Sequence, residues 1–180
     1  MEKYYKTECN SPIGKLTLCA TKDALIGVWI EGQKYFCDTV SETIENDDLK
    51  IFDETKKWLH EYFKGNKPKI NDLKLAPIGN EFRQRVWKIL CEIPYGETIT
   101  YGEIAGIIAK EKGIKRMSAQ AVGGAVGWNP ICIIIPCHRV VGTNGSLTGY
   151  GGGIKNKVEL LKLEGIDMNK YFIPKSGTAL

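Results

Sequence analysis

The spacing of apolar residues changes along the chain, and this change does most to limit the folds open to it. Between residues 15 and 30, two short apolar stretches show a period of two and are bounded by turn residues at 11–14, 22–23 and 32. This period predicts strands of an antiparallel meander. From residue 51 to residue 63 the apolar residues recur at helical spacing, and Gly65 follows where a helix-ending glycine is expected. The first 65 residues therefore predict a small α/β unit, although an acidic stretch at 42–48 is expected to be an exposed loop.

A second, helical unit follows a linker. Residues 65–77 contain two prolines together with asparagine and lysine, which is typical of a linker. We therefore expect an N-terminal α/β domain with its linker at 1–76 and a second domain at 77–180. In the second domain, Asn80 is placed to cap a helix that Pro94 and Gly96 end.

The next two helices are separated by a basic turn. Thr100-x-x-Glu103 has the form of a capping box, and a lysine-rich turn at 110–116 leads to a helix of small residues at 118–126. This arrangement indicates a helix-turn-helix, because small residues let a recognition helix approach a DNA groove. A three-helix bundle with a close-packed Ala/Gly seam fits the same pattern.

Charge favours the helix-turn-helix. The 180-residue chain has a net charge of +4, but residues 1–76 carry −1 and residues 77–180 carry +5. A basic half beside a nearly neutral one predicts that the second half binds a polyanion.

The six cysteines exclude several classes of site. None forms a Cys-x-x-Cys pair and the chain has two histidines, so neither a zinc ribbon nor a thioredoxin-like motif is present. Without an apolar signal segment or a membrane-spanning stretch, we expect reduced thiols in a cytoplasm and no contact with a membrane. The glycine-rich residues 141–153 lack the Gly-Lys-Ser/Thr ending of a P-loop, which argues against nucleotide hydrolysis.

One short motif has the residue types of a reactive site. The apolar run 131–135 leads into a Pro-Cys-His-Arg-Val motif at 136–140, where the Cys137 thiol lies in the positive potential of an imidazole and a guanidinium. Neighbouring side chains diverge on a helix, so His138 would reach the sulfur through a water molecule, with a carboxylate behind the imidazole. Glu164, at the end of an apolar helix, is our choice for that carboxylate. The alternative is that Glu164 is a solvated helix-end residue.

This motif, with Asn129-Pro130 before it and Gly149-Tyr150 and Leu163-Glu164-Gly165 after it, resembles the O6-alkylguanine-DNA alkyltransferase family, also called methylated-DNA–protein-cysteine methyltransferases. The resemblance is strong from about 80 to 167. It implies an α+β protein with a ribonuclease H-like N-terminal α/β domain and a C-terminal helical domain of winged helix-turn-helix type.

The resemblance also implies the activity. The protein would transfer a methyl or other alkyl group from O6-alkylguanine in double-stranded DNA to its own Cys137, once and irreversibly, after flipping the damaged base. Activity on O4-alkylthymine is left open. No cofactor is implied, and a monomer is expected.

Individual residues take roles from the same resemblance. Cys137 matches the alkyl acceptor, His138 the base acting through water, Glu164 the carboxylate of the relay, and Asn129 the residue that organises the turn. The positions expected to bind the damaged base are Tyr101, Arg139, Val140 (through its carbonyl group), Tyr150 and Gly151. Those expected to contact DNA are Arg116, Ser118, Ala119, Gln120 and Thr143.

The sequence departs from the family at two positions. Gln120 stands where the family commonly has an arginine that fills the gap left by the flipped base, and Arg116, four residues earlier, could supply that charge from one helical turn away. Cys132 stands where some members have proline, which suggests a looser pocket wall that admits larger alkyl groups. Some members bind zinc, but His60 is a lone helix histidine, so we expect no metal.

Two other functions fit part of the pattern. A cysteine hydrolase could use Cys137, His138 and Glu164, but adjacent Cys and His rarely pair directly and no oxyanion donors are evident. A DNA-binding protein without catalytic activity could share the scaffold, although the intact Cys137 argues against it.

Overall fold

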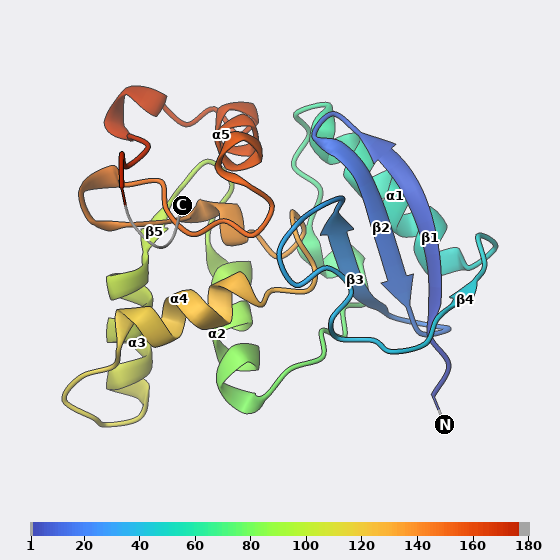
Figure 1. The fold of residues 1–180 in the computed structure, drawn as a ribbon, viewed down its shortest axis with the longest axis horizontal. Helices are drawn as coiled ribbons and strands as arrows, with labels where there is room; N and C mark the ends of the chain where they lie inside the picture. Colours follow the sequence, from blue (N-terminus) through green and yellow to red (C-terminus); the bar gives the residue numbers. More distant parts are fainter. Residues whose placement is uncertain (1, 177–180) are drawn as a thin grey trace.

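The N-terminal unit is a small sheet covered by one helix (Figure 1). The computed structural model describes residues 2–176. Strands β1 (Tyr5–Ser11), β2 (Gly14–Ala20) and β3 (Leu25–Ile30) form the predicted antiparallel meander, in the sheet order β3-β2-β1-β4. β4 (Ile44–Glu45) lies in the acidic stretch expected to be a loop, and it pairs parallel to β1 with both residues exposed. The helical period correctly predicted α1 (Lys50–Phe63), whose apolar side is buried.

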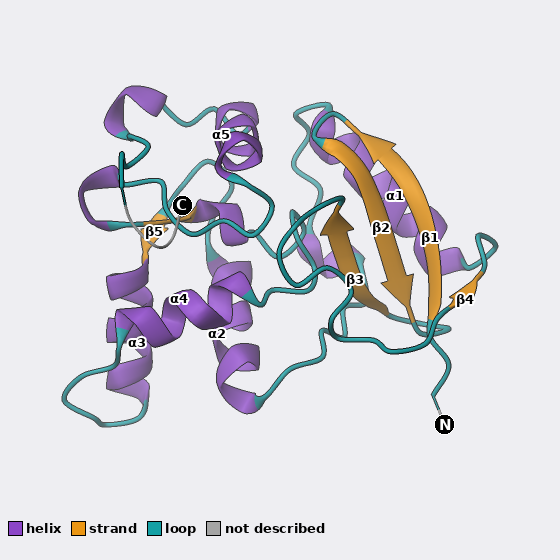
Figure 2. Cartoon of the chain, viewed as in Figure 1, coloured by secondary structure: helices purple, strands orange, loops and turns teal. Residues whose placement is uncertain are grey.

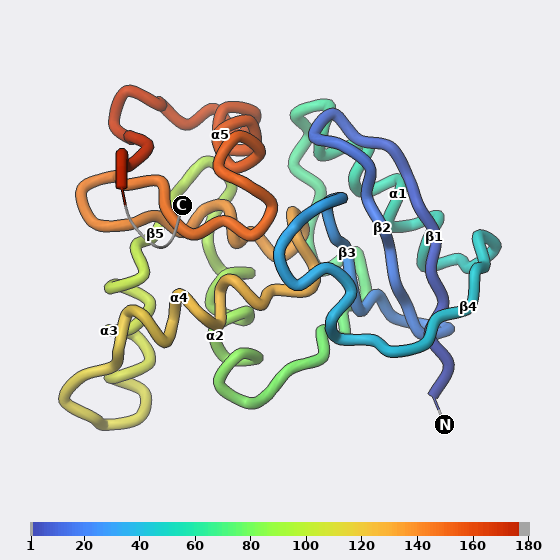
Figure 3. The backbone as a smooth tube through the Cα atoms, viewed as in Figure 1, coloured from blue at the N-terminus to red at the C-terminus, as the bar shows by residue number. Residues whose placement is uncertain are grey.

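The outer edge of β3 is paired to segments from elsewhere in the chain. The Leu25 amide donates to the Lys74 carbonyl at 2.9 Å, so the expected linker continues the sheet. The Val28 amide donates to the Pro130 carbonyl at 2.8 Å, and Val28 accepts from the Cys132 amide at 3.0 Å. In Figure 3 the chain leaves α4, runs toward β3 and then turns back. The segment that precedes Cys137 is therefore anchored to the N-terminal sheet.

The rest of the chain is mainly helical (Figure 2). Its helices are α2 (Glu81–Glu92), α3 (Tyr101–Glu111), α4 (Ala119–Gly127) and α5 (Ile154–Leu163). Short strands β5 (Ile99–Thr100) and β6 (Val140–Val141) pair in parallel, and single turns of 3-10 helix lie at Ile70–Asp72, Cys137–Arg139, Thr143–Gly145 and Met168–Lys170.

The predicted caps are present. The Asn80 side chain accepts from the Arg83 amide at 2.9 Å, and Thr100 and Glu103 form a complete capping box. Helix α3 and helix α4 pack together as the two helices of the helix-turn-helix, and the Ser118 hydroxyl caps α4. The alternative, a three-helix bundle with a close-packed Ala/Gly seam, does not fit Gly124, because a Cβ atom there would meet open space. The small residues of α4 instead leave a low surface exposed to solvent.

One apolar core joins the sheet, α1 and the helices. All five residues of the run 131–135 are buried in it, as predicted. Among residues 2–176, no helix is both long and apolar enough to cross a membrane.

Candidate active site

Cys137 begins a single turn of 3-10 helix, Cys137–Arg139, directly after the buried run. Its side chain is 5% exposed. The neighbouring Cys132 thiol is the main cause that lowers the Cys137 pKa, and the Asn129 amide and the Lys157 ammonium add to it, while burial acts in the opposite direction. The net pKa lies below the usual value for a thiol, so the site favours the thiolate.

His138 and Glu164 form the expected pair in the protein interior. His138 Nε2 lies 2.7 Å from Glu164 Oε1, and both side chains are fully shielded from solvent. Because Glu164 accepts the hydrogen bond at Nε2, the proton of the neutral imidazole is on Nε2 and the lone pair is on Nδ1. Nδ1 is itself buried and has no hydrogen-bond partner among the described residues. The alternative of a solvated Glu164 is therefore wrong.

Arg139 points to the same carboxylate. Its Nε and Nη2 atoms donate to Glu164 at 2.8 and 3.0 Å, and its Nη1 atom donates to the Ile93 carbonyl at 2.7 Å. Burial would raise the pKa of Glu164, but the hydrogen bonds and charges of His138 and Arg139 outweigh it and lower this pKa to about 2. Burial lowers the pKa of His138 more than Glu164 raises it, so His138 is neutral at pH 7.

Asn129 holds the turn that carries the buried run. Its Nδ2 atom donates to the Ile135 carbonyl at 2.8 Å, and its Oδ1 atom accepts from the Ile131 amide at 3.0 Å. Between these contacts Ile133 has a φ of 72°, which is strained for a β-branched residue. A side-chain amide with both a donor and an acceptor is what this turn requires.

A glycine-rich loop, residues 141–153, lies against the site. The Tyr101 hydroxyl donates to the Thr148 carbonyl of this loop at 2.9 Å. The Gly151 carbonyl accepts from the Lys34 amide of the N-terminal unit at 3.1 Å. Burial and the Cys137 thiolate raise the pKa of the Tyr101 and Tyr150 phenols, so both phenols are neutral.

The Val140 carbonyl already has a partner. The Lys157 ammonium, which is fully buried, donates to it at 2.5 Å and to the Thr148 carbonyl at 3.0 Å. Sequence reasoning missed Lys157, although its position on the apolar side of α5, three and four residues before Leu160 and Leu161, was a usable signal. It also missed Tyr62 of α1, whose hydroxyl donates to Glu164 Oε1 at 2.7 Å.

The residues expected to contact DNA all lie on the surface, four of them at or just before the start of α4 and Thr143 in the 3-10 turn Thr143–Gly145. The exposed residues are Arg116, Ser118, Ala119, Gln120 and Thr143. Arg116 precedes the Ser118 cap, so the expectation that it lies one helical turn from Gln120 is wrong. Helix α4 begins too late to include it, and Arg116 belongs to the turn.

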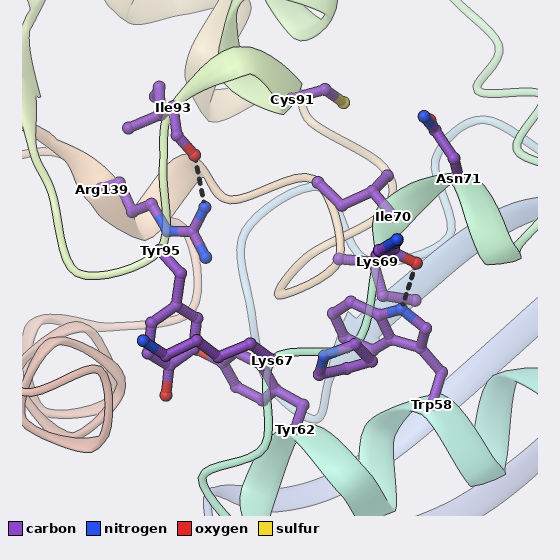
Figure 4. Close-up of a pocket in the computed structure, with 12 residues that line it drawn as sticks. Trp58, Tyr62, Lys67, Lys69, Ile70, Asn71, Cys91, Ile93, Tyr95 and Arg139 are labelled. Atoms are coloured by element: carbon purple, nitrogen blue, oxygen red, sulfur yellow. Dashed lines mark hydrogen bonds between the residues drawn. The ribbon is translucent and has the colours of Figure 1, made fainter.

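A cavity of about 300 Å³ lies between the two units, and it is lined by α1, residues 67–71 and side chains of the second unit that include Arg139. Figure 4 shows Trp58 and Tyr62 of α1 facing Tyr95 and Arg139 across it. Within residues 2–176, no group of three His, Cys, Asp or Glu residues is placed to hold a metal ion.

Comparison with known proteins agrees with the two-part architecture. Residues 3–77 match the model of the 6-O-methylguanine DNA methyltransferase ribonuclease-like domain, and residues 81–166 match that of the DNA-binding domain. The chain is 47% identical to a methylated-DNA–protein-cysteine methyltransferase of Methanosarcina acetivorans, over 86% of this chain and 94% of the relative. It is 39% identical to one of Haemophilus influenzae, over 92% and 89% respectively.

Solved structures are also similar. The crystal structure of Mycobacterium tuberculosis O6-methylguanine methyltransferase superposes with a TM-score of 0.75 at 43% identity, covering 89% of this chain and 92% of that one. The same organism's OGT in complex with DNA gives a TM-score of 0.76 at 40% identity, with 94% of each chain covered. From the site and these matches together, the chain belongs to the methylated-DNA–protein-cysteine methyltransferase family, which repairs DNA by direct reversal.

Proposed function

We propose that Cys137 accepts an alkyl group from O6-alkylguanine in double-stranded DNA. One observation carries the proposal: a cysteine with a lowered pKa directly precedes a neutral, buried histidine whose Nε2 atom is fixed on Glu164 and whose Nδ1 atom is free to accept a proton. This arrangement suits proton removal from the thiol through a water molecule on the Nδ1 side.

The chemistry is a displacement at saturated carbon. The thiolate sulfur attacks the alkyl carbon, the S–C bond forms as the C–O6 bond breaks, and the electron pair of that bond stays on the guanine. The thiol proton passes through water to His138, the displaced guanine anion takes a proton at N1 from water, and the imidazolium returns its proton to water, so atoms and charge balance. A soft thiolate needs neither an oxyanion hole nor a metal for this step. Because the product is a thioether, which water does not cleave, each protein molecule acts once.

The other residues bind and position. Asn129 holds the turn, while Tyr101, Tyr150 and Gly151 form the loop side of a pocket for the flipped base. The Val140 carbonyl, held by Lys157, is proposed to accept from the guanine amino group. Arg139 takes a different role from the one expected for it, since its guanidinium is bound to Glu164 and stabilises the relay.

DNA contact is assigned to the second domain. Ser118, Ala119 and Gln120 present an exposed surface at the start of α4, Arg116 lies in the turn before it, and Thr143 is exposed in the 3-10 turn after β6. We place the domain boundary between residues 76 and 77. We further propose that the protein acts as a monomer in the cytoplasm, where its six free cysteines would stay reduced.

The test is to weigh the intact protein after incubation with a duplex that contains one O6-methylguanine. We expect one added methyl group on Cys137 and none in Cys137→Ser. Repeated turnover of small esters or amides would indicate a hydrolase instead. DNA binding without any gain of mass would indicate a protein that only binds.

A further inference from the structure

We infer that Tyr62, in the N-terminal domain, is a positioning residue of the alkyl-transfer relay. Its hydroxyl donates to Glu164 Oε1 at 2.7 Å and lies 3.3 Å from His138 Nε2. The inference rests on the proposed function of Cys137 and adds to it, because it gives the N-terminal domain a part in the chemistry.

The Tyr62 ring is held so that the hydroxyl keeps this place. Tyr62 is 1% exposed and stacks on Trp58, with ring centroids 5.6 Å apart and planes 10° apart. Tyr95 packs against it edge-on at 6.2 Å, and the Trp58 indole donates to the Lys69 carbonyl at 2.9 Å, as Figure 4 shows. The stacked indole on one side and the edge-on phenol on the other hold the Tyr62 ring in the orientation that points its hydroxyl at Glu164.

The hydroxyl completes the set of donors around the carboxylate. Glu164 Oε2 accepts from Arg139 Nε at 2.8 Å and from the Gly96 amide at 3.3 Å. Oε1 accepts from Arg139 Nη2, from the Tyr62 hydroxyl and from His138 Nε2. Tyr62 is the member of this set that comes from the N-terminal domain, so docking of α1 brings the donor to the relay.

The expected effect is on the basicity of His138. Burial and the charge of Glu164 raise the pKa of Tyr62, so the phenol stays a neutral donor. Each donor on a carboxylate disperses its charge and weakens its attraction for a positively charged imidazole. Tyr62 therefore keeps the His138 pKa low and its Nδ1 atom available as a base at neutral pH. Because Arg139 binds both carboxylate oxygens, the carboxylate should keep its place when the hydroxyl is removed.

Tyr62→Phe tests this, with Tyr95→Phe as the matched control. Tyr95 lies against the same ring, and its hydroxyl donates to the Leu163 carbonyl at 3.2 Å rather than to Glu164. The first readout is the titration of His138 by nitrogen-15 NMR of histidine-labelled full-length protein, with His60→Gln to assign the two histidines. The second is the single-turnover rate of methyl transfer against pH, with protein in excess over an O6-methylguanine duplex.

In Tyr62→Phe we expect the His138 pKa and the midpoint of the rate profile to move up together by about 0.5 to 1 pH unit. Tyr95→Phe should leave both where they are in the wild type, even if both variants lose stability. If Tyr62→Phe does not fold, 3-fluorotyrosine at position 62 keeps the hydroxyl as a stronger donor and should move both values down.

Curves that overlay those of the wild type, or that move in the opposite direction, would overturn the inference. Failure of the proposed function is a separate result, since the wild type would then gain no methyl group. The NMR titration needs no activity, so it tests the contact with Glu164 in either case.

Discussion

Glu164 Oε1 lies 2.7 Å from His138 Nε2, in a position where neither side chain reaches solvent. A buried carboxylate is stable there only because Arg139, His138 and Tyr62 surround it. The pair therefore has two consequences, one for catalysis and one for the stability of the protein against acid.

Glu164→Gln should lower both the rate of methyl transfer and the stability of the fold. Removing the charge leaves the Arg139 guanidinium buried without its partner, which we expect to cost about 3 to 5 kcal/mol in the free energy of unfolding. Methyl transfer should slow, because the amide no longer stabilises the positively charged imidazole. The control is Glu159→Gln on α5, the helix that Glu164 ends, where the carboxylate is 52% exposed and, within residues 2–176, pairs with Lys162. Denaturant unfolding checks the prediction, and equal losses in the two variants would contradict it.

The same carboxylate predicts how stability falls in acid. The folded-state pKa of Glu164 is about 2, below its ordinary value of 4.5, so the stabilisation is present above pH 4.5 and is lost as the pH falls toward 2. The difference in unfolding free energy between wild type and Glu164→Gln should shrink over this range. A difference that stays constant from pH 5 to pH 2.5 would mean that Glu164 keeps its ordinary pKa in the folded protein.

Lys157 also makes the unfolding free energy rise with pH, but in an alkaline range. Burial lowers its pKa from 10.5 to about 8, so the folded protein binds fewer protons than the unfolded chain between these values. Raising the pH from 8 to 10.5 should stabilise the wild type relative to Lys157→Met by about 3 kcal/mol. Other groups titrate in this range, but they do so in both proteins and cancel. Parallel stability curves for the two proteins would show that Lys157 keeps its ordinary pKa.

How much of this the sequence could predict depends on how far apart the interacting residues are. The meander, α1, the caps of α2 and α3 and the buried run before Cys137 all follow from local spacing, and they are confirmed. The short strand β4 was missed, because two exposed residues that pair with β1 leave no periodic signal. The pairing of Val28 with residues 130–132 joins distant parts of the chain and has no local signal either.

The site shows the same limit. The Pro-Cys-His-Arg-Val motif identified the reactive thiol and its neighbours, but the motif alone does not say where Arg139 points. The spacing of Tyr62 along α1 is that of a core residue, so it gives no sign of a functional hydroxyl. Its hydroxyl has a partner 102 residues away, so only the docking of the two domains reveals it.

We expect Gly149→Ala to disturb the contact between Tyr101 and the glycine-rich loop. Its φ is +70°, and a Cβ atom there would lie 2.9 Å from the Tyr101 hydroxyl. Gly153, with a φ of +90° and open space around it, is the control. Alanine at either position should cost about 1 to 2 kcal/mol of stability. Only Gly149→Ala should displace the Tyr101 contact with the loop, and it should slow methyl transfer at least about tenfold. Single-turnover rates of the two variants decide this, and equal rates would contradict the role given to Tyr101.

The basic turn before α4 predicts a charge effect on DNA binding. Arg116 is exposed and precedes the Ser118 cap, so it is placed to contact a phosphate rather than a base. Arg116→Ala should weaken binding to any duplex about equally and should lower the slope of log affinity against log salt by about 1. Gln120→Arg adds a charge on α4 and should raise that slope by a similar amount. Lys50→Ala, on the N-terminal domain with a side chain 89% exposed, is the control for loss of a surface charge and should leave the slope unchanged. The measurement is a titration of labelled duplex at several salt concentrations. If Lys50→Ala and Arg116→Ala changed the slope equally, the DNA would not be bound at the start of α4.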